Sequence, residues 1–243
     1  MRILSLGIVA VICGVTGFVG VMMSLMLLTA PNTSPDTQRA DSVPQATSPV
    51  GPQAAVQPLS PVFSPEVLYW SDLIRAWAIL YEVDPNLLAT IIQIESCGYP
   101  GALSYAGAQG LFQVMPFHFL PGEDYLDPNT NAHRGIAHLL FSLQSYDNHF
   151  GLALAAYNGG VSGVQNGWSN WGNGQNSGDQ PRRYYLWGTR IYADAVSGRT
   201  TSPAVQAWLA ADERNHPNGP SLCERARAAQ QQLDEQADAP LAG

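Results

Sequence analysis

The chain has 243 residues, which is enough for one sizeable domain with additional segments. All 11 basic residues are arginines, and the part from residue 63 onward holds 9 of them beside 17 acidic residues, a net charge of −8. This acidity argues against a nucleic acid or an anionic membrane surface as the partner, whereas neutral sugars bind without net charge.

The chain begins with a long uncharged stretch, residues 3–30. A membrane-spanning helix needs roughly 20 apolar residues, whereas the core of a cleaved signal peptide usually has about 7–15. Pro31 would directly follow a cut after Leu-Thr-Ala, which disfavours cleavage. We therefore expect residues 1–30 to form an uncleaved signal anchor with the rest of the chain outside the cytoplasmic membrane. Cleavage and secretion is the alternative.

Residues 31–62 carry seven prolines, many Ser, Thr and Gln, and no aromatic residue. Such a composition cannot bury enough apolar surface to order itself, so it predicts a disordered tether. The folded domain is then expected to occupy residues 63–243.

The domain has a helical pattern almost throughout. A capping residue followed by proline, typical of helix starts, occurs at Ser64, Asp84 and Asp127. The predicted helices cover residues 64–83, 84–96, 127–146, 151–160, 181–195, 203–214 and 220–236. Residues 101–114 could hold a short hairpin, and the last two helices form a C-terminal extension over 200–236. The fold class is therefore mainly α.

Glu95 stands at the end of the predicted helix over residues 84–96. Leu88, Ile91 and Ile92 share its face, so the helix is expected to be buried on most sides. Burial and the partial negative charge of a helix C-terminus both favour the neutral form of a carboxyl group. Such a group suits general acid catalysis, and the alternative is a buried glutamate with a structural role.

Cys97 and Cys223 would both face an oxidising exterior, where disulfides persist. A bond between them would pin the C-terminal segment to the helix that bears Glu95, but the sequence gives no geometry and leaves the pairing open. No Cys-x-x-Cys motif or histidine cluster occurs, so neither a metal nor another cofactor is expected.

Three motifs carry a resemblance to a known family: ESCGYPGALSYAGAQGLFQVMP from Glu95, DPNTNAHRGIAHL from Asp127, and ALAAYNGGVSGV from Ala153. In this order and spacing they resemble the signatures of the soluble-lytic-transglycosylase family, over about residues 67–195. The resemblance implies an α+β, lysozyme-like fold. It also implies cleavage of the MurNAc–GlcNAc bond of peptidoglycan without water, leaving a 1,6-anhydro end.

The resemblance also implies roles for individual residues. Glu95 would protonate the leaving oxygen and then deprotonate the 6-hydroxyl of the sugar, an intramolecular attack that gains from proximity. The implied substrate-binding residues are Ser104, Gln113, Met115, Tyr157 and Asn158, with close backbone approach at Gly107, Ala108 and Gly110. A turn at 104–110 and a core position for Tyr157 are the structural alternatives.

The sequence departs from the family pattern at two places. Gln180 stands where the family has an acid before Tyr184, which puts a contact of Gln180 to the site in doubt, and Cys97 interrupts the usual Glu-Ser-Gly. Trp168 and Trp171 lie in a polar loop, where they could stack on sugar rings or anchor the loop.

These observations lead to one expected function and two alternatives. We expect a membrane-tethered, monomeric lytic transglycosylase whose partner is the glycan strand of peptidoglycan. A lysozyme-type hydrolase on the same fold is the first alternative, although no second acid stands in a comparable signature. A non-catalytic module that binds peptidoglycan or acts as a scaffold is the second.

Overall fold

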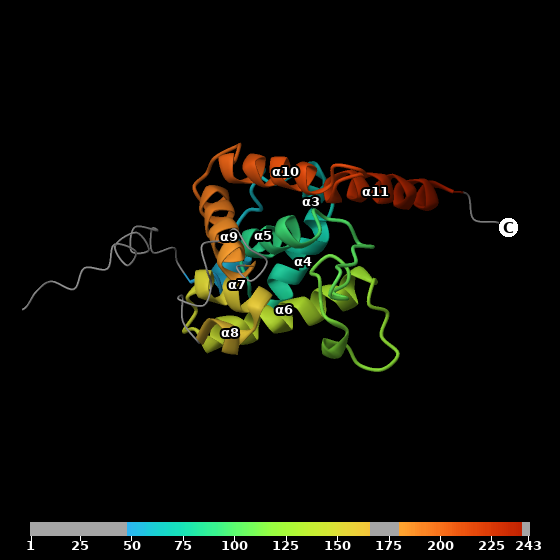
Figure 1. Cartoon of the computed structure of the whole chain (residues 1–243). Coiled ribbons are helices and arrows are strands. Elements are labelled where there is room, and N and C mark those ends of the chain that lie inside the picture. Colours follow the sequence, from blue (N-terminus) through green and yellow to red (C-terminus); the bar gives the residue numbers. More distant parts are fainter. Residues whose placement is uncertain (1–47, 166–179, 240–243) are drawn as a thin grey trace, which may run out of the picture. The chain divides into compact units, whose positions relative to one another are not determined.

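The computed structural model describes residues 48–165 and 180–239 (Figure 1). The chain divides into two units, Met1–Ser42 and Val43–Gly243, and the first lies outside the described residues. The helices are α2 (Pro52–Ala55), α3 (Pro65–Leu68), α4 (Ser71–Tyr81), α5 (Pro85–Glu95), the 3-10 helix η1 (Pro116–His118), α6 (Pro128–Ser145), α7 (Phe150–Gly159), α8 (Val161–Gln165), α9 (Gln180–Val196), α10 (Pro203–Asn215) and α11 (Leu222–Asp238). The predicted mainly helical class is confirmed.

The predicted hairpin over residues 101–114 takes the form of isolated β-bridges. Leu103 pairs with Gln109, and Gln109 also pairs with Val114, both antiparallel. Within the described residues no bridge extends into a strand. Glycines 107 and 110, both with positive φ, turn the chain too often for a ladder to propagate.

Helix α5 forms the centre of the core. Its residues 85–93 are all buried, and it packs against α3, α4 and α9. Each fully buried Leu or Ile side chain contributes roughly 1.5–3 kcal/mol, so this helix is fixed firmly in the domain. Its last residue, Glu95, is consequently held in one place.

All three predicted helix starts agree with the structure, and at two of them the side chain of the capping residue makes the cap hydrogen bond. Asp84 accepts from the amide of Asn86 and Asp127 from that of Thr130, each at 2.8 Å. Ser64 precedes α3, but its hydroxyl contacts the sulfur of Cys97 at 3.4 Å and makes no cap. The predicted helix over 64–83 is divided into α3 and α4, and at the break the indole of Trp70 donates to the carbonyl of Gly98 at 2.8 Å.

Part of the predicted tether packs on the domain. Asn86 of α5 accepts from the amide of Ser60 at 2.8 Å and donates to the carbonyl of Pro58 at 3.0 Å. Val62 is buried, and α2 precedes this segment. The packed segment therefore begins before residue 63, the predicted boundary, because the buried Asn86 side chain satisfies two backbone groups of this proline-rich segment. The rest of the predicted tether, 31–47, lies outside the described residues.

The predicted membrane span over residues 3–30 also lies outside the described residues. Among the helices that are described, none combines the length and the apolar character that crossing a membrane requires.

The C-terminal extension consists of α10 and α11, whose bounds lie within two residues of the prediction. Helix α10 packs on α9, and α11 packs on α10 and α3 (Figure 1). A capping box starts α11, in which the Ser221 hydroxyl accepts from the Glu224 amide and the Glu224 carboxylate accepts from the Ser221 amide.

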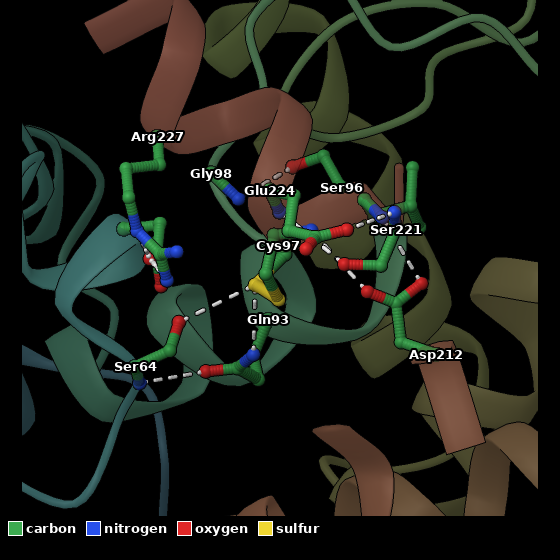
Figure 2. The surroundings of a disulfide bond; sticks show 12 residues. Ser64, Gln93, Ser96, Cys97, Gly98, Asp212, Ser221, Glu224 and Arg227 are labelled. Carbon is green, nitrogen blue, oxygen red and sulfur yellow. Dashed lines mark hydrogen bonds and ion pairs between the residues drawn. A yellow bond between two sulfur atoms is a disulfide. The ribbon is translucent and has the colours of Figure 1, made fainter. Parts of the chain in front are cut away.

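Cys97 and Cys223 form a disulfide, the pairing that the sequence left open, with their Cα atoms 5.0 Å apart. Figure 2 shows how polar contacts surround it: Gln93 donates to the Cys97 sulfur at 3.4 Å, and the Cys223 amide donates to Asp212 at 3.2 Å. Glu66 lies close to both sulfurs, but disulfide sulfurs are not thiolate ligands, so this group is no metal site. The bond therefore attaches the start of α11 to Cys97, which follows Glu95 by two residues in the chain.

Candidate active site

Glu95 lines a cleft of about 610 Å³. The loop over residues 102–115 supplies one wall, and His118, His138, Tyr157 and Asn158 supply another part of the lining. Gln180 at the start of α9 and His216, Leu222 and Arg225 of the C-terminal extension complete it. The cleft thus gathers side chains from segments more than a hundred residues apart.

The Glu95 carboxyl is partly exposed to this cleft but surrounded by protein. Burial raises its pKa from 4.5 to about 8, and the nearby Tyr184 hydroxyl lowers it by a smaller amount. The group is therefore mostly protonated at neutral pH, as its position in the sequence predicts. A carboxyl that keeps its proton at pH 7 can deliver it to a bound substrate.

Two tyrosines stand beside Glu95. The Tyr157 hydroxyl donates to the Phe112 carbonyl at 2.7 Å, and the Tyr157 and Tyr184 rings stack with centroids 6.2 Å apart. Burial, together with the charge of Glu95, raises the pKa of both phenols. The Tyr184 oxygen is buried, and among the described residues it finds no partner in hydrogen-bond geometry. Both phenols are neutral, and the Tyr184 hydroxyl lies next to the acid.

Asn131 of α6 holds the loop that forms the first wall. Its side-chain oxygen accepts from the Phe112 amide at 2.8 Å, and its nitrogen donates to the carbonyls of Gln109 and Tyr125 at 2.8 and 2.9 Å. Gly110 has φ +78°, and a Cβ there would lie 2.3 Å from the Asn131 side chain. The loop therefore needs a glycine at 110 to let the asparagine reach the backbone.

Replacing Asn131 with alanine is expected to lower the free energy of unfolding by about 2–4 kcal/mol, since three backbone groups, one buried and two partly buried, lose their partner. Activity should fall further than stability explains, because the loop carries Ser104 and Gln113 to the cleft. Denaturant unfolding and cleavage rates at a temperature where the variant is folded measure the two effects. Asn129→Ala is the matched control, because Asn129 is exposed and accepts a bond from Trp77 alone. Equal losses in both variants would contradict this role of Asn131.

Ser104 and Gln113 line the cleft and also shape the loop. The Ser104 hydroxyl accepts from the Ala108 amide at 2.9 Å, and the Gln113 side chain donates to the carbonyls of Ala102 and Gly110 at 3.0 Å each. The predicted turn over 104–110 is thus present, and it does not exclude contact with substrate. The serine proton and the glutamine oxygen remain as groups that could face a sugar.

The other predicted substrate residues divide into three sets. Met115, Tyr157 and Asn158 line the cleft, and so does Gln180, despite the doubt that its departure from the family pattern raised. Tyr184 interacts with Glu95 but is not itself in the lining. Trp168 and Trp171 lie outside the described residues, so their stacking stays a prediction.

The sequence pattern missed His138 and Tyr105, two residues of the lining. His118 and His138 lie with ring centroids 4.7 Å apart, and His138 contacts the Tyr157 carbonyl at 3.1 Å. Burial lowers the pKa of both rings, so they are neutral near pH 7. Tyr105 is fully exposed at the lining. No spacing in the sequence links these residues to Glu95, and the fold alone brings them together.

A second cavity, of about 550 Å³, has Asp84 and Tyr192 in its lining. Both oxygens of Asp84 are used, one by the Asn86 amide groups and the other by the Tyr192 hydroxyl at 2.8 Å. This carboxylate caps α5 and ties it to α9. The cleft of Glu95 therefore remains the candidate active site.

Comparison with known proteins finds similarity over the segment that holds Glu95 and the cleft loop. Residues 72–178 match the family model of the transglycosylase SLT domain. A transglycosylase of Enterobacteria phage PRD1 is 37% identical over 107 residues, which cover 43% of this chain and 38% of that protein. Membrane-bound lytic murein transglycosylase E of Buchnera aphidicola is 30% identical over 114 residues, which cover 39% of this chain and 52% of the relative.

Among solved structures, the 70 kDa soluble lytic transglycosylase of Escherichia coli aligns with a TM-score of 0.38 at 22% identity. That alignment covers 64% of this chain and 25% of the Escherichia coli protein. The matched region is therefore shared with only about half, or less, of each relative's length. The segment that resembles the transglycosylase SLT domain, residues 72–178, holds Glu95 and the loop that forms its cleft wall.

Proposed function

We propose that this protein is a lytic transglycosylase that cleaves the MurNAc–GlcNAc bond of peptidoglycan and leaves a 1,6-anhydro end. The observation that carries the proposal is the isolation of Glu95: among the described residues that line the cleft, it is the only carboxyl group. Glycoside hydrolysis ordinarily needs two carboxyl groups on either side of the bond. One suffices where the sugar supplies its own nucleophile.

In the proposed reaction, Glu95 donates its proton to the glycosidic oxygen while the bond from that oxygen to C1 breaks. The Glu95 carboxylate then takes the proton of the 6-hydroxyl as O6 bonds to C1, so the carboxyl is regenerated and no water is consumed. The raised pKa of Glu95, about 8, supports the first step. The second step is intramolecular, which gives it the advantage of proximity.

The test is mass spectrometry of the muropeptides that the full-length protein releases, with Glu95→Gln as control. Anhydro-muramyl ends that disappear in the control are the expected result. Reducing ends, heavier by one water, would identify a hydrolase and point to a second acid outside the described residues. Folded protein that binds glycan strands and releases nothing would support the binding-module alternative.

The pH dependence offers a separate test of Glu95 as the acid. Since the carboxyl must be protonated before cleavage, kcat/KM is expected to fall as pH rises through about 8. Tyr184→Phe removes the hydroxyl that lowers the pKa of Glu95, so the falling limb should move to higher pH. Tyr69→Phe, at an exposed tyrosine bonded to Asp234, is the control that should leave the limb in place. If the fall of kcat/KM occurs at the same pH in Tyr184→Phe as in the unsubstituted protein, Glu95 is not the acid.

We also propose that the reaction takes place outside the cytoplasmic membrane, with residues 3–30 as the anchor. The uncharged stretch supports this placement, as does a relative named as membrane-bound. Fractionation of cells that express the full chain, compared with a chain lacking residues 3–30, tests it. Recovery of both in the soluble fraction would contradict anchoring.

A further inference from the structure

The C-terminal extension takes part in the cleft, although it lies outside the segment that matches the family model. His216, Leu222 and Arg225 line the same cleft as Glu95. Their position is fixed by the Cys97–Cys223 disulfide and by Asp212, which accepts from the amides of Leu222 and Cys223 at 3.2 Å (Figure 2). These residues therefore form a fixed wall.

Arg225 is the arginine of this wall, and it has no counter-ion among the described residues. Its Nε atom donates to the Ser221 carbonyl at 3.4 Å, which orients the guanidinium group. Carboxylates near it in the chain are already occupied: Glu224 closes the capping box, and Asp212 binds amides and His216. A partly buried cation in an acidic protein is thus available to an anion from outside.

His216 is a second polar side chain that the C-terminal extension adds to the lining. Its Nδ1 atom contacts the Asp212 carbonyl at 2.8 Å, and a carbonyl can only accept, so Nδ1 carries the proton. The wall therefore presents a guanidinium group and an imidazole ring to the cleft, both held in place by the fold of α10 and α11.

We propose that Arg225 binds a carboxylate carried by the glycan strand, so that the C-terminal extension makes the cleft prefer acidic over neutral glycans. The inference rests on the proposed function. In peptidoglycan this carboxylate comes from one of two sources, the lactyl ether of a muramic acid without a stem or the peptide stem itself. A guanidinium fork matches a carboxylate in two hydrogen bonds, a geometry that lysine cannot reproduce.

The experiment measures binding by calorimetry to the full-length Glu95→Gln protein, which does not consume its ligand. The three ligands are a neutral GlcNAc tetrasaccharide, a stem-free peptidoglycan tetrasaccharide, and the same tetrasaccharide with stems. Adding Arg225→Gln should weaken binding of the acidic ligands by about tenfold, the usual scale for a charge-assisted pair in a partly exposed cleft. Binding of the neutral ligand should change less than twofold. Loss with the stem-free ligand identifies the lactyl group, and loss with the stem-bearing ligand alone identifies the stem.

Arg214→Gln is the matched control, because Arg214 is an exposed arginine of α10 outside the cleft lining, and its change should leave all three affinities unaltered. If Arg225→Gln does not fold, Arg225→Lys and the salt dependence of the unsubstituted arginine serve instead: added salt should weaken the acidic ligands alone. Equal losses for neutral and acidic ligands, or none, would overturn the inference and leave the proposed function standing. Folded Glu95→Gln protein that binds none of the three sugars would overturn both.

Discussion

Replacing Glu95 with glutamine is expected to lower the cleavage rate by about 10²–10⁴-fold, the range over which a positioned acid or base contributes. We expect a loss near the upper end, because the same carboxyl serves both steps of the proposed reaction. Glutamine keeps the shape of the side chain but has no proton to give. Release of soluble muropeptides measures the rate, and Glu213→Gln, at an exposed acid of α10, is the matched control.

The same substitution should change stability in a pH-dependent way. Below pH about 4.5, Glu95 is protonated in both the folded and the unfolded chain; between there and about 8, only the folded chain keeps the proton. The stability of the unsubstituted protein therefore declines across this window, whereas glutamine does not titrate. Denaturant unfolding should find Glu95→Gln more stable by about 1–4 kcal/mol at pH 8 and equal at pH 4. A variant less stable at pH 8 would show that the carboxyl is satisfied by its surroundings.

The raised pKa of Glu95, which favours activity but lowers stability at higher pH, could be predicted from the sequence because its causes are local. An apolar run from Leu87 to Ile94 predicts a helix buried on most sides, and Glu95 at its end must share that burial. Helix starts were predictable for the same reason, since Asp84 and Asp127 cap amides two or three residues away. Interactions of this kind involve residues close together in the chain, so a short stretch of sequence is enough to predict them.

What the sequence could not predict depends on contacts between distant segments. Residues 58–60 pack only because Asn86, in another helix, satisfies their backbone. The second wall of the cleft is of this kind as well: Arg225 is 130 positions from Glu95 in the chain and reaches the cleft through the fold of α10 and α11. The one indication of that proximity was the pair of cysteines, whose bonding the sequence left open.

Removing that disulfide with the double substitution Cys97→Ser and Cys223→Ser is expected to lower the free energy of unfolding by about 2–5 kcal/mol. The bond closes a sequence separation of 126 residues, so its loss frees a long loop in the unfolded chain. Because the bond also fixes α11 beside the end of α5, the wall with Arg225 should become less ordered. KM for stem-bearing strands is then expected to rise more than kcat falls.

Reduction separates the bond from the packing of the side chains. A reductant should reproduce both effects in the unsubstituted protein and change nothing in the double variant, while Cys13→Ser, outside the described residues, should keep the response of the unsubstituted protein. A double variant that unfolds more easily but keeps its KM would mean that Asp212 and the pairing of Arg227 with Glu66 hold α11 in place without the bond. If reductant also raises KM, the redox state of Cys97 and Cys223 controls the wall that contains Arg225. Glu95 would not account for the change, because it belongs to the buried core helix α5 and stays in place when the bond is broken.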